Sequence, residues 1–403
     1  MKNIRIKIVS VFLPFAMLLC VNMCSGQNNC NVRLVKKFDI RNGGNAEIIQ
    51  YDSSKNIIAA TNSKNHYLDF YKVTSLSAGD IELIAGIKIN SEPTSVAAND
   101  NKNFVVLSRL ADSNTLSEII FVDVNSFKEI KNIPFGVEID SLAISPDGKW
   151  LVIADEAEEN PNTPGAIWAL NLSSPLDNNL SPVRLAGLDK LTGINLGILE
   201  PEFVAFDPQN KFAAVSCQEN DLIVIADVQH STPILTGVIK LTEGAQPDGI
   251  AAIRGLLSLP ADSSLIAAAE EGEKDRNGKH TGQCVSFYSL SGDLKQSELL
   301  SRVDVRKYLC PDKPEKRCDP EGIALAKIKD RFFAFIGIER LNKLLILEIT
   351  NPRSPIFITA LDTGPRPEGV ITVERDGKIY ILTADEAGNS STGSISIFEL
   401  TVN

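Results

Sequence analysis

Pro320-Glu321-Gly322-Ile323 and Pro367-Glu368-Gly369-Val370 are two copies of the short stretch that decides the fold. Each copy has a polar residue or proline, an acidic residue, a small or variable residue, and an apolar residue that opens a strand. The pattern occurs seven times, and the other copies begin at Ala46, Pro93, Ile139, Pro201 and Pro247. Successive second positions are 47, 46, 62, 46, 73 and 47 residues apart. A period of about 45 residues is typical of β-propellers.

Each repeat predicts four short strands. In the fourth repeat they are Phe203–Phe206, Phe212–Ser216, Leu222–Ala226 and Ile234–Ile239. Runs of β-branched and aromatic residues between turn residues are the usual signature of strands, and four strands make one blade. We therefore expect an all-β fold of the WD40/YVTN-like repeat type, a seven-bladed propeller with four-stranded antiparallel blades.

The two ends of the chain predict how the ring closes. The seventh repeat supplies three strands, and one unassigned strand, Val32–Ile40, precedes the first repeat. An open ring would leave unpaired strand edges that favour aggregation, so we expect this strand to complete the last blade. The alternative is that it forms an N-terminal arm. The expected organisation is a signal peptide over residues 1–26 and one propeller domain over residues 27–403.

The signal peptide is predicted from three features of the N-terminus. Lys2, Arg5 and Lys7 precede an apolar run, and small residues stand before Gln27. We expect an exported protein, periplasmic, at the cell surface or extracellular, with no transmembrane segment. A lipid anchor at Cys24 is the alternative, but the bulky Met23 stands where a lipidation signal has a small residue.

Charge and cysteine content narrow the function further. The formal net charge of −11 argues against nucleic-acid binding, because the chain would repel phosphates. Cys310 and Cys318 bracket a Pro- and charge-rich loop, which predicts a local disulfide in an oxidising compartment. A metal clip is the alternative. The pairing of Cys30, Cys217 and Cys284 stays open.

Acidic residues gather where the pattern meets the channel. In a propeller the first strand of each blade lines the central channel, so the second position of the pattern faces one rim. The seven residues there are Glu47, Thr94, Asp140, Glu202, Asp248, Glu321 and Glu368, and all of them except Thr94 are acidic. The ends of the second strands supply another acidic series: Glu156, Glu219, Glu271, Glu339 and Glu386.

Two series of carboxylates on one rim raise each other's pKa unless a cation offsets them. Ca²⁺ accepts six to eight oxygen ligands in flexible geometry, so we expect the eleven acidic residues of the two series to supply a Ca²⁺ site. Mg²⁺ ranks second because it demands stricter geometry, and three scattered histidines argue against zinc. The alternatives are a solvated channel mouth and pairing with Arg109, Arg340 and Arg366.

Several stretches carry a resemblance to a known family. They are Ile139-Asp140-Ser141-Leu142-Ala143-Ile144-Ser145-Pro146-Asp147-Gly148-Lys149 with Ala154–Glu158, Pro201–Ala205 with Gln218–Asn220, Pro320–Ala324 with Ile338–Arg340, and Pro367–Val370 with Ala384–Glu386. The chain resembles the secreted choice-of-anchor I propellers, which include alkaline-phosphatase-like and mesenchyme-specific cell-surface glycoprotein-like sequences. The resemblance implies a seven-bladed propeller outside the cytoplasm, similar to calcium-dependent propeller phosphoesterases such as phytases.

Two classes of function remain open. The first is a monomeric binding module that takes a protein, glycan or small-molecule ligand at the channel rim. The second is a metal-dependent hydrolase of phosphate esters or, as a weaker alternative, of lactones. The sequence contains no GxSxG, HExxH or P-loop motif, so no catalytic residue is assigned.

Overall fold

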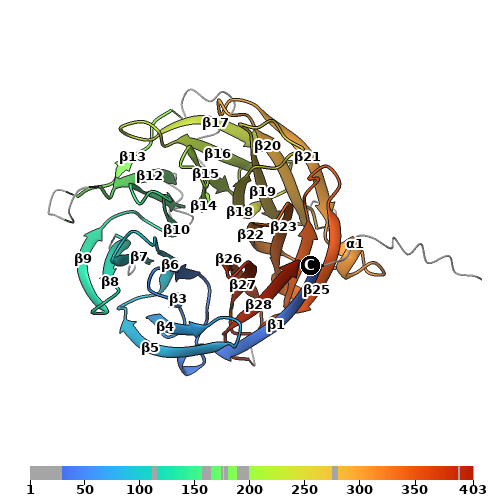
Figure 1. The fold of residues 1–403 in the computed structure, drawn as a ribbon. Coiled ribbons are helices and arrows are strands. Elements are labelled where there is room, and N and C mark those ends of the chain that lie inside the picture. The colour runs from blue at the N-terminus through green and yellow to red at the C-terminus, as the bar shows by residue number, and fades with distance from the viewer. Residues whose placement is uncertain are drawn as a thin grey trace, which may run out of the picture.

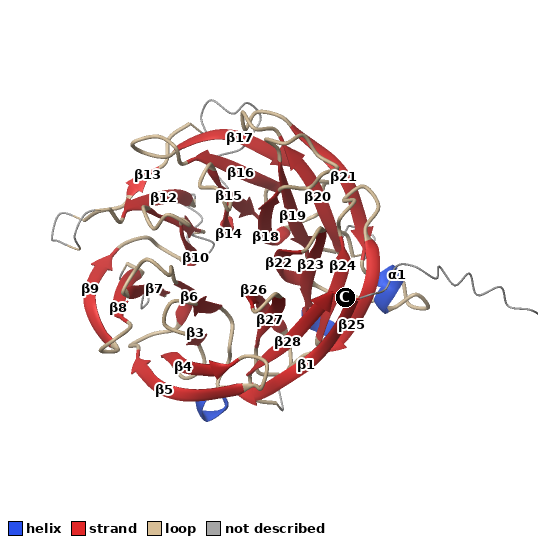
Figure 2. Ribbon diagram, viewed as in Figure 1, coloured by secondary structure: helices blue, strands red, loops and turns tan. Residues whose placement is uncertain are grey.

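Seven four-stranded antiparallel sheets stand around a central channel in the computed structural model (Figure 1). The structure describes residues 30–110, 116–156, 165–173, 176, 180–187, 199–274, 280–388 and 391–402. The predicted signal peptide and Cys24 lie outside these residues. The predicted seven-bladed, all-β fold is confirmed, and Figure 2 shows how little helix interrupts the strands.

The blades follow one another along the chain, and each runs from the channel outward. Blade one contains β2 (Ile49–Asp52), β3 (Ile57–Asn62), β4 (Tyr67–Ser75) and β5 (Asp80–Lys88). Blade two contains β6 (Pro93–Ala97), β7 (Phe104–Arg109), β8 (Glu118–Asp123) and β9 (Lys128–Pro134). Blade three contains β10 (Ile139–Ile144), β11 (Trp150–Asp155), β12 (Ala166–Asn171) and β13 (Val183–Arg184). Blade four contains β14 (Pro201–Phe206), β15 (Phe212–Cys217), β16 (Leu222–Asp227) and β17 (Ile234–Lys240). Blade five contains β18 (Pro247–Arg254), β19 (Ser264–Glu270), β20 (Cys284–Leu290) and β21 (Ser297–Asp304). Blade six contains β22 (Pro320–Ile328), β23 (Arg331–Ile338), β24 (Lys343–Glu348) and β25 (Ile356–Asp362). Blade seven contains β26 (Pro367–Arg375), β27 (Lys378–Asp385) and β28 (Ser394–Val402). Short helical turns occupy Arg41–Gly43, Arg306–Leu309 (α1) and Glu339–Leu341.

The core lies between adjacent blades. The second strands β3, β11, β15 and β19 are buried along their whole length, since each is covered on both faces. One cluster joins Phe212 and Ile223 of blade four to Ile266 and Tyr288 of blade five. Because every blade buries its faces against its neighbours, the chain needs no single large core.

Strand β1 (Cys30–Asp39) closes the ring, as the sequence predicts. It pairs antiparallel with β28 from Cys30 opposite Val402 to Asp39 opposite Ser394. The last sheet therefore has the order β1-β28-β27-β26. Figure 1 shows the C-terminal end of the chain lying along β1.

The repeated pattern forms an irregularity at the start of the inner strand. In blades two to seven the register with the second strand shifts there, for example between Pro320 and Ile323 and between Pro367 and Val370. Bulges of this kind often re-aim a side chain next to a functional site. In blades four to seven the residues left out of regular pairing are the acidic residue and the one that follows it, and in blades two and three only the second position, Thr94 or Asp140, is left out.

The small residue lets neighbouring blades approach each other. A Cβ added to Gly322 would overlap the carbonyl oxygen of Glu368, and one added to Gly369 would overlap that of Glu47. The Gly369 amide donates a hydrogen bond to the same Glu47 carbonyl, at 2.9 Å. Backbone contact between blades thus fixes the positions of successive acidic residues around the channel.

Candidate functional site: an acidic chamber in the channel

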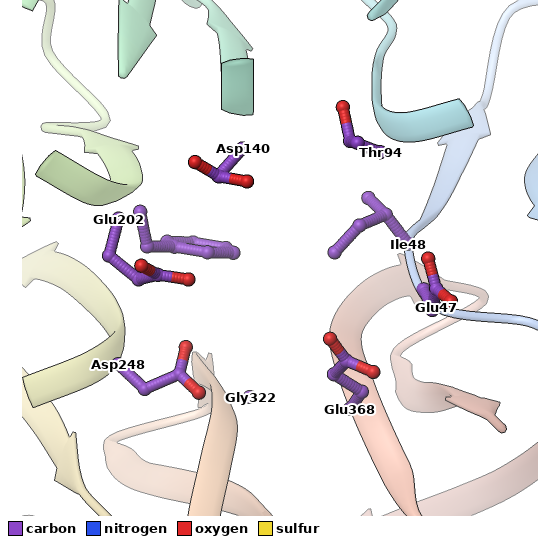
Figure 3. Close-up of a pocket in the computed structure, with 9 residues that line it drawn as sticks. Glu47, Ile48, Thr94, Asp140, Glu202, Asp248, Gly322 and Glu368 are labelled. Carbon is purple, nitrogen blue, oxygen red and sulfur yellow. The ribbon is translucent and has the colours of Figure 1, made fainter. Parts of the chain in front are cut away.

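A cavity of about 140 Å³ lies where the inner strands begin. We call it the acidic chamber, and all seven blades contribute to its wall. Its lining consists of Glu47, Ile48, Thr94, Asp140, Glu202, Phe203, Asp248, Gly322 and Glu368. Figure 3 shows Glu47 and Glu368 facing Asp140, Glu202 and Asp248 across the cavity.

The acidic residues at the second position of the repeat form what we call the inner ring. Five of them line the chamber, namely Glu47, Asp140, Glu202, Asp248 and Glu368, and the sixth, Glu321, precedes the lining residue Gly322. Burial is the main cause that raises the pKa of each, and neighbouring carboxylates raise it further. The pKa is raised to about 7 for Asp248, to about 8 for Glu47 and to about 10 for Asp140. Several of these groups therefore hold a proton at neutral pH when no cation is present.

Two outer carboxyls contact the inner ring directly. Glu156 hydrogen-bonds with both Asp140 and Glu202, and Glu386 hydrogen-bonds with Glu47. A hydrogen bond between two carboxyls requires a proton on one of them. Each of these three contacts therefore needs a proton on one of its two carboxyls.

One member of the inner ring has a buried oxygen without a partner. Asp140 Oδ2 is buried and has no hydrogen-bond partner among the described residues. Glu321 is 9% exposed, and its pKa is raised by burial and further by the charges of Glu368 and Asp248, which line the chamber. An unsatisfied buried oxygen is costly, so Asp140 Oδ2 marks a place for a donor or a cation.

The outer acidic series differs, because arginines neutralise part of it. Arg366 pairs with Glu339, and its Nη1 lies 2.6 Å from Glu386 Oε2. Both carboxylates are buried, with Glu339 only 1% exposed. Arg366 has a left-handed backbone, with a φ of 47°, immediately before the pattern's proline. That conformation is rare outside glycine and asparagine and is found where surrounding contacts impose it.

Two further arginines continue this network around the rim. Arg317 pairs with Glu271, and its Nε lies 2.7 Å from Asp319 Oδ1. Arg340 Nε lies 2.8 Å from Asp319 Oδ2 and 2.9 Å from Glu339 Oε2. The sequence pattern indicates Arg340 as a possible partner of the acids but not Arg317, which lies in the charged loop before Cys318.

The remaining predicted positions lie apart from the chamber. Glu219 is exposed and accepts a hydrogen bond from Gln246 Nε2 at 2.8 Å. Its neighbour Gln218 contacts the rim instead, donating to Glu271 Oε2 at 3.0 Å. Arg109 pairs with Glu118, not with a rim carboxylate.

A contrast between adjacent acids separates structural from candidate functional carboxylates. Asp385 accepts hydrogen bonds from the Gly364 amide at 3.0 Å and from Ser394 and Ser396 hydroxyls at 2.9 and 2.6 Å. The next residue, Glu386, reaches toward the inner ring. Asp155 is similarly satisfied by backbone amides, at 2.8 and 3.0 Å, and the next residue, Glu156, contacts the ring. The first acid of each pair stabilises the blade, and the second belongs to the rim.

Metal and disulfide predictions have no direct support in this geometry. Within the described part of the chain, no group of three or more His, Cys, Asp or Glu is arranged to hold a metal ion. Cys310 and Cys318 are in contact but are free thiols in the structure. Cys30, Cys217 and Cys284 are also free. Both the calcium site and the disulfide stay predictions.

Solved structures with a similar fold are remote in sequence. The Cps50 (Swd1) β-propeller domain of Myceliophteria thermophila covers 91% of this chain and 99% of its own, with a TM-score of 0.62 and 10% identity. The match to hydrazine synthase of Kuenenia stuttgartiensis covers 91% of this chain and 98% of that one, with a TM-score of 0.61 and 14% identity. The match to the RRP9 WD40 repeats covers 92% of this chain and 98% of that one, with a TM-score of 0.61 and 9% identity. At these identities the likeness concerns the fold alone.

Comparisons by sequence are more selective. A search of curated proteins found no match. None of the described helices is long and apolar enough to cross a membrane. The family model of the choice-of-anchor I domain matches residues 47–174, which contain most of the first three blades. The resemblance expected from the sequence is therefore confirmed: over residues 47–174 this seven-bladed propeller matches the choice-of-anchor I domain.

Proposed function

We propose that this protein is an exported interaction module that binds a cationic ligand in the acidic chamber of its propeller channel. The observation that carries the proposal is the inner ring, of which five carboxyls (Glu47, Asp140, Glu202, Asp248 and Glu368) line one cavity and the sixth, Glu321, is buried. Among the described residues, no lysine or arginine forms an ion pair with any of the six. The choice-of-anchor I match and the signal-peptide-like N-terminus support export.

The pKa shifts supply a physical reason for cation binding. Carboxyls that retain protons only because they are buried together release them when a cation offers its charge. Binding at neutral pH is then an exchange of protons for the cation, and it relieves the repulsion within the ring. The arginines of the outer series form their ion pairs with Glu271, Glu339 and Glu386, so they only partly offset the inner ring, where Arg366 counteracts part of the rise that burial causes in the pKa of Glu368.

Calcium is one candidate ligand under this proposal. The hydrolase alternative requires a bound metal to hold a phosphate above these carboxylates, so calcium binding is its first requirement. The WD40 domains among the structural neighbours support an interaction role only by analogy of fold.

A cation titration of the mature chain tests the proposal. Calorimetry and thermal unfolding at neutral pH would compare Ca²⁺, Mg²⁺, alkylammonium and guanidinium ions after treatment with a chelator. At least one cation is expected to raise the Tm and to release protons, seen as a heat that depends on the buffer. The double variant E202Q/E368Q is expected to lose this response.

A matched control removes the same kind of charge elsewhere. Asp362 lies on outer strand β25, and its side chain is 86% exposed beside Lys343. The D362N variant is expected to keep the full response. The proposal is overturned if none of the four cations changes the Tm or produces a binding heat in the wild-type protein.

A further inference from the structure

A second cavity of about 500 Å³ continues from the acidic chamber along the inner strands. We call it the apolar vestibule. It is lined by twenty residues, none of them charged, and only Gln50, Ser95, Ser141 and Thr372 are polar. Ile48 and Phe203 line both cavities, so the two spaces are neighbours along the channel.

Ile48 and Phe203 occupy a special position in the repeat. Both follow the acidic residue of their blade, where the other blades have serine or glycine. They belong to blades one and four, and Figure 3 shows Ile48 pointing into the chamber. The change from small to bulky residues therefore places two apolar side chains at the junction between carboxyls and vestibule.

The chamber is a poor match for a bare metal ion. Its volume of about 140 Å³ is several times the roughly 30 Å³ that one water molecule occupies. Ca²⁺ requires six to eight oxygens at 2.3–2.6 Å, whereas Ile48 and Phe203 supply none. The described residues also include no group of three ligating side chains placed around one point.

An ammonium group fits the same wall better. It has three N–H donors and needs only three acceptors. Asp140 Oδ2 is a buried acceptor without a donor among the described residues, and Glu202, Asp248 and Glu368 add carboxyl oxygens to the same wall. An aliphatic chain attached to the amine would lie against Ile48 and Phe203 and continue into the apolar vestibule, as long amphipathic side chains do.

We infer that the channel binds an alkylammonium chain, with the amine among the inner-ring carboxyls and the carbon chain passing Ile48 and Phe203 into the vestibule. This inference rests on the proposed function and names its ligand class. The chain is either a free long-chain amine or a lysine side chain of a protein, which offer the same chemistry.

Calorimetry with a set of simple probes tests the inference. Hexylammonium carries both parts, methylammonium carries the charge alone, and hexanol carries the chain alone. Each buried methylene is expected to tighten binding by roughly two- to fourfold, so hexylammonium is expected to bind far more tightly than methylammonium and hexanol hardly at all. A capped lysine, N-acetyl-lysine methylamide, then distinguishes the sources: affinity close to that of hexylammonium points to a protein lysine, and much weaker affinity points to a free amine.

Variants separate the chain from the charge. F203S introduces the residue type that blades two and three use at this position, and it is expected to weaken hexylammonium binding at least fivefold while leaving methylammonium unchanged. I48S is expected to act in the same direction. The control L257S removes an apolar side chain that is 95% exposed and is expected to change neither.

The outcomes are distinguishable from failure of cation binding itself. The inference is overturned if methylammonium or Ca²⁺ binds as tightly as hexylammonium, and the proposed cation-binding function is then retained. It is also overturned if hexanol binds as tightly as hexylammonium. If no cation binds at all, the proposed function falls and the inference falls with it. Circular dichroism of each variant confirms that the propeller is intact.

Discussion

Arg366 and Glu386 form an ion pair of 2.6 Å at the rim, one carboxyl away from the acidic chamber. Glu386 hydrogen-bonds with Glu47 of the inner ring, and Arg366 also pairs with Glu339. The ion pairs of Arg366 are therefore made with the outer series, although its charge also counteracts part of the rise that burial causes in the pKa of Glu368 in the inner ring. No arginine or lysine of the described residues forms an ion pair with an inner-ring carboxyl, which leaves the ring open to an exchangeable cation.

Removing the Arg366 charge should cost stability. The R366Q variant leaves Glu339 and Glu386 buried with one fewer cation, and unpaired buried carboxylates are destabilising. Because the Arg366 side chain is 43% exposed, solvent screens part of the effect, and we expect a loss of about 1–3 kcal/mol in urea unfolding. R353Q is the control: Arg353 and Glu298 form an exposed pair, and little or no loss of stability is expected. Equal losses in the two variants would contradict this account.

The inner ring should make the empty protein less stable as the pH rises. An acid with a raised folded-state pKa binds more protons when folded, so its stabilising contribution is full below its unfolded pKa of about 4 and is lost as the pH passes its folded pKa. The folded values of about 7 for Asp248, about 8 for Glu47 and about 10 for Asp140 place the loss between pH 4 and 10. The free energy of unfolding, measured in chelator from pH 5 to 9, should fall steadily.

Variants identify the groups responsible for this pH dependence. E202Q removes one titrating carboxyl from the ring and should flatten the decline. Glu298 is the control, because its hydrogen bond with Arg353 lowers its pKa, so its contribution changes only below pH 4.5. E298Q should leave the slope above pH 5 unchanged. A stability that is level or increasing over this range in the wild-type protein would refute the proton-holding ring.

The period of the repeat was enough to predict the fold, whereas the contacts within the site were not. The blades follow from the regular spacing of the repeated pattern, as between Pro320 and Pro367. The closing strand follows from the one strand, Val32–Ile40, that no repeat accounts for. Both features can be seen in the sequence because each is local. The inner ring was also predictable, since an acidic residue occupies the same position in six of the seven repeats. Phe203 carried a signal that was overlooked: it breaks the run of serine and glycine after the acid.

Contacts made by loops between repeats were beyond prediction. Arg317 reaches Glu271 across 46 residues of sequence, and nothing in the spacing of either residue indicates the pair. Glu219 aligns with the other outer acids by its place in the repeat, yet the adjacent Gln218 contacts the rim. A one-residue change in where a strand ends is enough to exchange the two side chains, and sequence patterns do not fix strand ends so closely.

Closure by β1 should be essential for a stable monomeric ring. Deleting residues 30–39 uncovers the edge of β28 along nine paired positions, and exposed strand edges promote association. The truncated protein should unfold at a lower temperature and should aggregate, as measured by differential scanning calorimetry and light scattering. Removing only the residues before Cys30 leaves β1 intact and should change neither measurement. A truncated ring that stays monomeric with an unchanged Tm would show that β1 is dispensable.

Oxidation should join Cys310 to Cys318, and we propose this bond as a stabiliser of the rim. The thiols are in contact and the loop between them carries Arg317, which holds Glu271 and Asp319. With oxidised glutathione as the oxidant, the two thiols lose two protons and two electrons to form the bond. Closing so short a loop is expected to add roughly 2–3 kcal/mol. Mass spectrometry should find this pair joined while Cys217, fully buried with a raised pKa, stays free. C310S should lose the gain in stability, and an oxidised wild-type protein that retains both thiols would contradict the prediction.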